Sequence, residues 1–280
     1  MKKMSFIGTG VMGSAIAKAA CEGNDPADIV VTDYDKEKAK RFAEEHGACF
    51  AQSNAEAVRM SKYILIGVKP QVGESVLSEI GPVIKECIEN GEEKVLVSIM
   101  VSVSIDTIKK WLGVEVDLPI IRTLPNVAAS VGKCITLCTN SSLVSDEIFE
   151  EYKTILRCTG SFELLSEKKM YAGSVITGCG PAFVAMFIEA LADGGVMTGL
   201  TRAQAQKFAI DTIIGTASLI EESGKHPEQL KDEVCSPGGS TIAGVVSLEK
   251  NGFRNAAVQC VLDTFKRVLD MGGVNEKDVV

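Results

Sequence analysis

The sequence predicts an α/β fold in which a doubly wound sheet over residues 1–165 is followed by an all-α domain over residues 166–280. Three observations carry this prediction. Apolar runs alternate with helical patterns from the N-terminus to about residue 164. A glycine-rich turn joins the first apolar run to the first helical one. From about Glu167 onward, long helical segments follow one another without a convincing strand.

The first two elements surround the glycine-rich turn. The apolar run Met4–Ile7 is expected to be a strand that passes through Gly8, Gly10 and Gly13 into a helix. Gly8 would make the tight turn, Gly10 would let a pyrophosphate approach the backbone, and Gly13 would let the helix lie close to the sheet. Asp33 ends the next apolar run, 20 residues after Gly13, near the position of a ribose-binding acid. The pattern therefore predicts a dinucleotide site of Rossmann type. The alternative, an ordinary glycine-rich turn, would not explain the acid.

The remaining elements of this domain follow the same alternation. The charged helical face of residues 36–47 ends at a glycine, and the uninterrupted apolar run 63–68 is typical of a buried parallel strand. Further strands are expected at 49–50, 95–99, 119–122, 134–138 and 160–164, with helices starting near 53 and spanning 76–87, 105–111 and 146–156.

The second domain contains a helix that is apolar on nearly all sides. Residues 181–197 are interrupted only by the charges of Glu189 and Asp193. Such a helix must be covered on several sides. About 115 residues of helices would struggle to cover it, so we expect a second copy of the chain to supply the missing surface. A self-contained bundle is the alternative.

Composition narrows the possible partners. The formal net charge of −8 argues against nucleic-acid binding, which favours a small-molecule partner. Neither a signal peptide nor an apolar run near the length of a membrane span is evident, so we expect no membrane contact and a cytoplasmic protein. Nine cysteines without a C-x-x-C motif suggest free thiols. With His46 and His226 the only histidines, neither a histidine-based metal site nor a catalytic triad is expected.

A second candidate site lies in the helical half. A Pro-Gly-Gly turn, residues 237–239, leads directly into a helix start that carries hydroxyls. Its free backbone amides and the helix dipole would bind a carboxylate, and the hydroxyls of Ser236, Ser240 and Thr241 could orient a polar atom beside it. A plain capped helix is the alternative interpretation.

These residues carry a resemblance: the chain is similar to pyrroline-5-carboxylate reductases over essentially its whole length. The most specific motif runs from Asp232 to Thr241, and the supporting matches are 6–13, 68–70, 178–183 and 191–196. The resemblance implies a helical dimerisation domain, a homodimer or a larger assembly built from dimers, and reduction of 1-pyrroline-5-carboxylate, a cyclic imino acid, to L-proline with NADPH or NADH. It also implies a site where cofactor from one chain meets substrate held by the other.

The resemblance further assigns roles to single residues. Thr241 would face the imine nitrogen. The other assignments fall into two groups. The carboxylate would be held by Ser236, Gly238, Gly239 and Ser240; the cofactor would be bound by Ile7, Gly8, Thr9, Gly10, Val11, Met12, Gly13, Asp33 and Asn54, with Val68, Lys69 and Pro70 at its nicotinamide half.

Two departures from the family pattern concern the nicotinamide pocket. The chain has Pro125-Asn126-Val127-Ala128 where the family usually has Pro-Asn-Thr-Pro, and 99–102 reads Ile-Met-Val-Ser where the family has small residues with a glycine. Whether the cofactor carries a 2′-phosphate is also open. Asp33 would repel this phosphate, whereas Lys36 and Lys38 stand nearby and the family leans to NADPH.

Other functions remain open at this stage. A related imine reductase and a β-hydroxyacid dehydrogenase share the domain plan, and the latter would need a catalytic lysine near residue 170, where Lys168 and Lys169 are available. A non-catalytic dinucleotide sensor is the rival of another class. Glu163, Glu167 and Lys168 are expected to be solvated surface charges. The Thr241 hydroxyl is a poor acid, so water could deliver the proton to the nitrogen.

Overall fold

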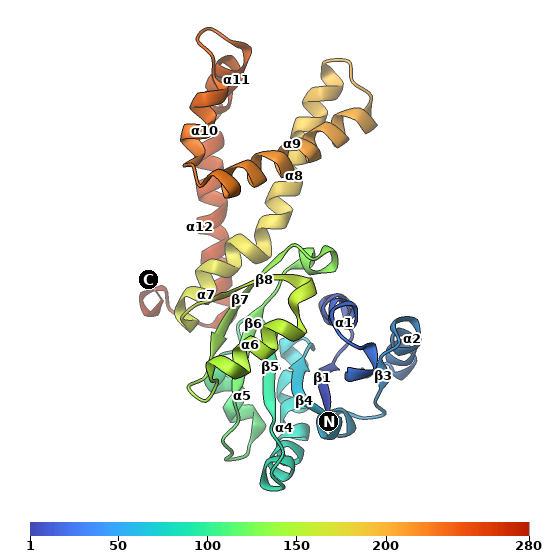
Figure 1. The fold of residues 1–280 in the computed structure, drawn as a ribbon. Helices are drawn as coiled ribbons and strands as arrows, with labels where there is room; N and C mark the ends of the chain where they lie inside the picture. The colour runs from blue at the N-terminus through green and yellow to red at the C-terminus, as the bar shows by residue number, and fades with distance from the viewer. Residues whose placement is uncertain (280) are drawn as a thin grey trace. The chain divides into compact units, whose positions relative to one another are not determined.

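The computed structural model describes residues 1–279, which form two compact units. The first comprises Met1–Gly178 together with the C-terminal segment that begins at Phe265, and the second comprises Cys179–Thr264. Figure 1 follows the chain through both. The predicted functional boundary between residues 165 and 166 stays a prediction.

The first unit is built on one eight-stranded sheet. Its spatial order is β3-β2-β1-β4-β5-β6-β7-β8, and every neighbouring pair is parallel except β6 with β7. The order reverses between β1 and β4, which makes a topological switch point at the carboxyl ends of these strands. The strands are β1 (Lys2–Ile7), β2 (Ile29–Thr32), β3 (Cys49–Phe50), β4 (Ser61–Ile66), β5 (Val95–Ser98), β6 (Ile120–Leu124), β7 (Cys134–Asn140) and β8 (Gly160–Leu164).

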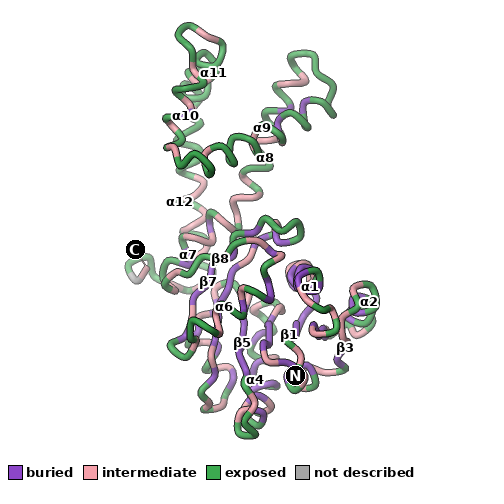
Figure 2. The backbone as a smooth tube through the Cα atoms, in the orientation of Figure 1, coloured by how far each residue is buried: buried purple, intermediate pink, exposed green. Residues whose placement is uncertain are grey.

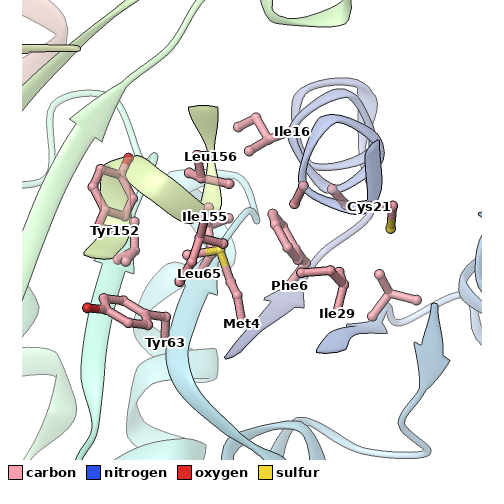
Figure 3. Packing of buried hydrophobic residues seen from close by; sticks show 14 of the residues in the cluster. Met4, Phe6, Ile16, Cys21, Ile29, Tyr63, Leu65, Tyr152, Ile155 and Leu156 are labelled. Carbon is pink, nitrogen blue, oxygen red and sulfur yellow. The ribbon is translucent and has the colours of Figure 1, made fainter. Parts of the chain in front are cut away.

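Helices cover both faces of this sheet. One core packs α1, α2 and α6 against alternate strand residues such as Phe6 and Leu65 (Figure 3), and the other packs α3, α4 and α5 against their neighbours, such as Ile7 and Ile66. The helices are α1 (Val11–Gly23), α2 (Lys36–His46), α3 (Asn54–Met60), α4 (Pro70–Glu89), α5 (Ile105–Leu112), α6 (Asp146–Ile155) and α7 (Glu167–Ser174). The predicted doubly wound α/β fold is confirmed.

β4 ends two residues earlier than predicted, at Ile66 instead of residue 68. The reason is Gly67, where a Cβ would stand 2.8 Å from the carbonyl oxygen of Gly8. The chain therefore crosses the glycine-rich turn at this point and leaves the sheet. Val68 follows as part of the loop before α4.

The second unit has almost no core of its own. Its helices are α8 (Gly180–Met197), α9 (Arg202–Ser223), α10 (Pro227–Val234), α11 (Ser240–Lys250) and most of α12 (Phe253–Gly272). In Figure 2 these helices are mostly exposed or intermediate, in contrast to the buried strands of the sheet. Of the large apolar side chains on α8 and α9, Met186 is 71% exposed, Phe208 51% and Ile214 61%. The described helices do not close into a self-contained bundle, so that alternative is wrong.

A continuous helical stretch, Glu167–Met197, joins α7 to α8 through a π-helical turn at Val175–Cys179. It is 31 residues long and, by length and composition alone, could cross a membrane. This finding corrects the expectation that no apolar run approaches that length. An apolar helix that packs against a second subunit passes the same test, because it too must be apolar on several sides.

Candidate active site

The absence of a Cβ has a different consequence at each of the three glycines of the first turn. Gly8 has a φ of +103°, and a Cβ there would lie 2.9 Å from the backbone of Gly67. A Cβ on Gly13 would lie 2.2 Å from the carbonyl oxygen of Gly8. A Cβ on Gly10, in contrast, would meet nothing within 4 Å. Gly8 and Gly13 therefore hold the turn tight, and Gly10 leaves open space above it.

The start of α1 is an exposed set of amide donors. Gly10 is its N-cap, and no side chain caps the first turn. The first amide to make a helical bond is that of Ser14, which donates to the carbonyl of Gly10 at 2.8 Å. The preceding amides and the positive end of the helix dipole therefore suit a phosphate group. These residues fit the pyrophosphate of a dinucleotide.

Asp33 is tied to the glycine turn. One of its carboxylate oxygens accepts hydrogen bonds from the Thr9 amide at 2.5 Å and the Thr9 hydroxyl at 2.9 Å, and the other accepts from the Asp35 amide at 3.0 Å. Burial raises the pKa of Asp33, but these hydrogen bonds outweigh it and hold the pKa below its usual value. The ionised Asp33 thus joins the end of β2 to the turn after β1.

A cleft of about 1170 Å3 opens beside this turn, at the switch point between β1 and β4. Seven of the predicted cofactor residues line it: Ile7, Gly8, Gly10, Asp33, Asn54, Val68 and Lys69. The other predicted residues lie behind the cleft surface or outside it. Thr9 is fully buried beneath Asp33, Gly13 faces Gly8, Val11 is exposed, and Met12 and Pro70 do not line the cleft.

The cleft also has a wall that the sequence analysis missed. Residues of α4 spaced by three and four positions face it, and Asn54 donates to Glu79 at 2.9 Å across the opening. The helical spacing of small and polar residues after Pro70 could have revealed this wall. The missed lining residues are Tyr34, Gln52, Ser53, Gly67, Gln71, Val72, Ser75, Val76 and Glu79; Lys36 and Lys38, expected beside Asp33, also line the cleft.

The departure at residues 99–102 does not reach this cleft. Met100 is only 1% exposed and packs in the core, where a Cβ on Gly73 would lie 2.5 Å from its sulfur. Ser102 adopts a φ of +63°, which is unfavourable for a residue with a Cβ. A glycine would adopt this conformation without strain because it has no Cβ.

Glu167 is not the solvated surface charge that was expected. Its carboxylate accepts from the amide of Ile105 at 2.9 Å and from the buried guanidinium of Arg122 at 3.3 Å. Burial holds the pKa of Arg122 below its usual value, although Glu167 and Tyr171 counteract this effect. Glu163, Lys168 and Lys169 are exposed on the surface, as expected for the first two.

In the second unit, Gly238 and Gly239 shape the loop before α11. Gly238 has a φ of +67°, and the Gly239 amide donates to the carbonyl of Ser236 at 3.0 Å. A Cβ on Gly239 would lie 2.4 Å from the hydroxyl oxygen of Ser236. These two glycines bring the Ser236 side chain against the start of α11.

No side chain caps α11 in the described chain. Its N-cap is Gly239, and the exposed hydroxyl of Thr241 makes no hydrogen bond within residues 1–279. No side chain therefore serves as the cap, and the choice between a carboxylate site and a plain capped helix stays a prediction. The amides of Ser240 and Thr241 open the helix and suit a carboxylate.

Comparison with known proteins places both regions in one family. Residues 167–271 match the model for pyrroline-5-carboxylate reductase dimerisation, and residues 3–102 match that for NADP oxidoreductase, coenzyme F420-dependent. The pyrroline-5-carboxylate reductase of Synechocystis is 38% identical over 272 residues, covering 96% of this chain and 98% of the relative. The chain belongs to the pyrroline-5-carboxylate reductase family. The Escherichia coli family member is 37% identical, covering 93% of this chain and 94% of the relative.

Solved structures of the pyrroline-5-carboxylate reductase family agree. The Plasmodium falciparum enzyme, a structure with NADP bound, is 30% identical with a TM-score of 0.84 and covers 97% of this chain and 98% of its own. The Coxiella burnetii enzyme is 26% identical with a TM-score of 0.86 and covers 96% and 98%. The predicted family and fold class are confirmed.

Proposed function

We propose that this chain reduces 1-pyrroline-5-carboxylate to L-proline with a reduced nicotinamide dinucleotide. The observation that carries the proposal is the family relationship over 96% of the chain. One known activity then explains both the cleft of the first unit and the start of α11 in the second, which no side chain caps. The proposed domains are a dinucleotide-binding domain at 1–165 and a helical dimerisation and substrate domain at 166–280.

In this proposal the first unit holds the cofactor. The open amides at the start of α1 bind the pyrophosphate, and Gly10 leaves room for it. Asn54, Val68 and Lys69 border the rest, and Pro70 begins α4 directly behind them. Thr9 and Gly13 support the turn from behind, while Val11 and Met12 supply donors through their backbone. A bound reduced nicotinamide supplies the hydride.

The second unit holds the substrate. The amides of Gly239, Ser240 and Thr241 and the hydroxyl of Ser236 bind the carboxylate at the start of α11, where the Gly238 turn leaves them open. The free hydroxyl of Thr241 bonds the imine nitrogen. A protonated cyclic imine is already electrophilic, so positioning and one polar partner suffice, and water delivers the proton.

We propose NADH as the preferred cofactor. The carboxylate of Asp33 lines the cleft and is held ionised by Thr9 and Asp35, so it disfavours a 2′-phosphate. Lys36 and Lys38 line the same cleft and offset part of this repulsion. The preference is therefore expected to be moderate.

We further propose a homodimer in the cytoplasm. The exposed apolar faces of α8 and α9 and the match to a dimerisation family support a second copy as their cover. All nine cysteines are free thiols, which agrees with a reducing compartment.

The test is steady-state oxidation of NADH and of NADPH with and without 1-pyrroline-5-carboxylate. Imine-dependent oxidation of either cofactor supports the proposal. Cofactor binding without turnover would favour the sensor. Faster reduction of cyclic imines that lack a carboxylate would favour a related imine reductase, and oxidation of a β-hydroxyacid would favour the dehydrogenase.

A further inference from the structure

Asn126 connects the sheet to the helix that leads out of the first unit. It follows β6 and is only 8% exposed. Its side-chain oxygen accepts from the amide of Ala128 at 2.9 Å, and its Nδ2 donates to the carbonyl oxygen of Thr177 at 2.6 Å. The two ends of one amide therefore fix the turn after β6 and the π-helical turn at Val175–Cys179.

The carbonyl of Thr177 needs this donor because of the sequence that follows it. In an α-helix it would accept from the amide of the residue four positions later, which is Pro181. Proline has no amide proton and cannot supply that bond. Thr177 lies in the π-helical turn, and there the amide of Asn126 supplies its carbonyl with a donor.

The other end of the same helical segment is fixed as well. Glu167, the first residue of α7, accepts from the Ile105 amide and pairs with Arg122. The segment 167–177 is thus held to the sheet unit at both ends. The residues immediately after the Asn126 contact are Gly178, Cys179 and Gly180, and the boundary between the two units falls after Gly178.

We infer that Asn126 is a positioning residue for the reaction: by holding the Thr177 carbonyl, it fixes the last turn of the helical segment before the chain leaves the first unit. The inference rests on the proposed function, in which cofactor and substrate are bound by different units. Hydride transfer then depends on how firmly this segment is held where the chain passes from the cofactor unit to the substrate unit. A purely structural bond would contribute to stability and leave the turnover of the folded enzyme unchanged.

The test is Asn126→Ser in the full chain. Serine can still cap the turn at Ala128, but its side chain is too short to reach Thr177. We expect kcat to fall roughly tenfold to a hundredfold, since small misplacements of reacting groups cost about that much. KM for NADH should stay within about twofold, because the cofactor cleft does not include Asn126.

The matched control is Asn24→Ser. The Asn24 side chain also connects backbone segments that are far apart in the sequence, because it donates to the carbonyls of Ala20 and Ile155 at 2.8 Å each. Neither acceptor belongs to the helical segment that begins at Glu167. Its loss should lower stability and leave kcat unchanged. A rescue variant completes the set: Pro181→Ala restores an amide donor for Thr177, so adding Asn126→Ser to it should lower kcat by less than about threefold.

Hydrogen exchange gives a measurement that does not depend on activity. Asn126→Ser should speed amide exchange in the peptide covering residues 171–181, and Asn24→Ser should not. Unchanged exchange there would overturn the inference even if the wild-type protein reduced no imine. Faster exchange with wild-type kcat would also overturn it, as would an equal loss of kcat with and without Pro181→Ala.

Discussion

Ser102→Gly should stabilise the protein. Ser102 has a left-handed φ of +63°, and its hydroxyl is buried without a hydrogen-bond partner in the described chain. The backbone conformation costs about 1–2 kcal/mol for a residue with a Cβ. An unpaired buried hydroxyl costs about 1–3 kcal/mol. Glycine offsets part of the gain, because it loses more conformational entropy on folding, which costs roughly 0.5–1 kcal/mol. The net gain should therefore be about 1–4 kcal/mol.

Thermal unfolding at one fixed protein concentration measures this gain, because assembly makes the Tm depend on concentration. Each kcal/mol should raise the Tm by roughly 2–4 °C in a domain of about 200 residues. Ser102→Ala is the matched control, since it removes the hydroxyl and keeps the Cβ. The expected order of stability is glycine, then alanine, then serine. A glycine variant no more stable than the alanine variant would show that the backbone strain at this position does not exceed the entropic cost of glycine.

Four further predictions follow from the two sites. Gly10→Val should abolish dinucleotide binding with little loss of stability, because its side chain would occupy only the open space of the cleft; unchanged affinity in calorimetry would contradict this. Asp33→Ser should shift preference toward NADPH in steady-state kinetics. It should also destabilise the fold at neutral pH, and this difference should shrink below about pH 4, because a lowered carboxyl pKa stabilises only while the group is ionised. Met186→Glu should weaken the dimer in sedimentation, and a wild-type chain that is a folded, active monomer would refute the proposed assembly. Thr241→Ala should lower kcat/KM by roughly tenfold to a hundredfold with nearly unchanged unfolding, since its hydroxyl caps no helix; wild-type kcat/KM would remove it from the catalytic residues.

Much of the first unit could be predicted because its signals are local. A buried parallel strand is continuously apolar, and a glycine with a positive φ or a close backbone neighbour is required wherever the chain turns between strand and helix. Gly8 meets both conditions, and Gly13 meets the second. The end of β4 was misplaced because Gly67 leaves the sheet only when the backbone of Gly8 lies beside it, and that neighbour is distant in the sequence.

The candidate site was less predictable where a side chain has a choice of partners. Asp33 stands at the position expected for a ribose ligand, but three of its hydrogen bonds go to the protein. In the sequence, Glu167 looks like a solvated surface charge. Only the fold brings Arg122 and the start of α5 next to it. Sequence spacing predicts which residues reach a site and gives little information on what holds them there.

The helix from Glu167 to Met197 shows how a sequence can indicate that such a contact exists. Its composition alone fits a membrane span or a subunit interface equally well. Pro181 adds a physical requirement, because a proline inside a helix leaves a carbonyl without its donor. A part-buried carbonyl beside such a proline is stabilised by another donor, and here the donor is the amide of Asn126, more than 50 residues earlier in the chain. Asking where each displaced hydrogen bond goes therefore predicts that a partner must exist, even where only the structure identifies it.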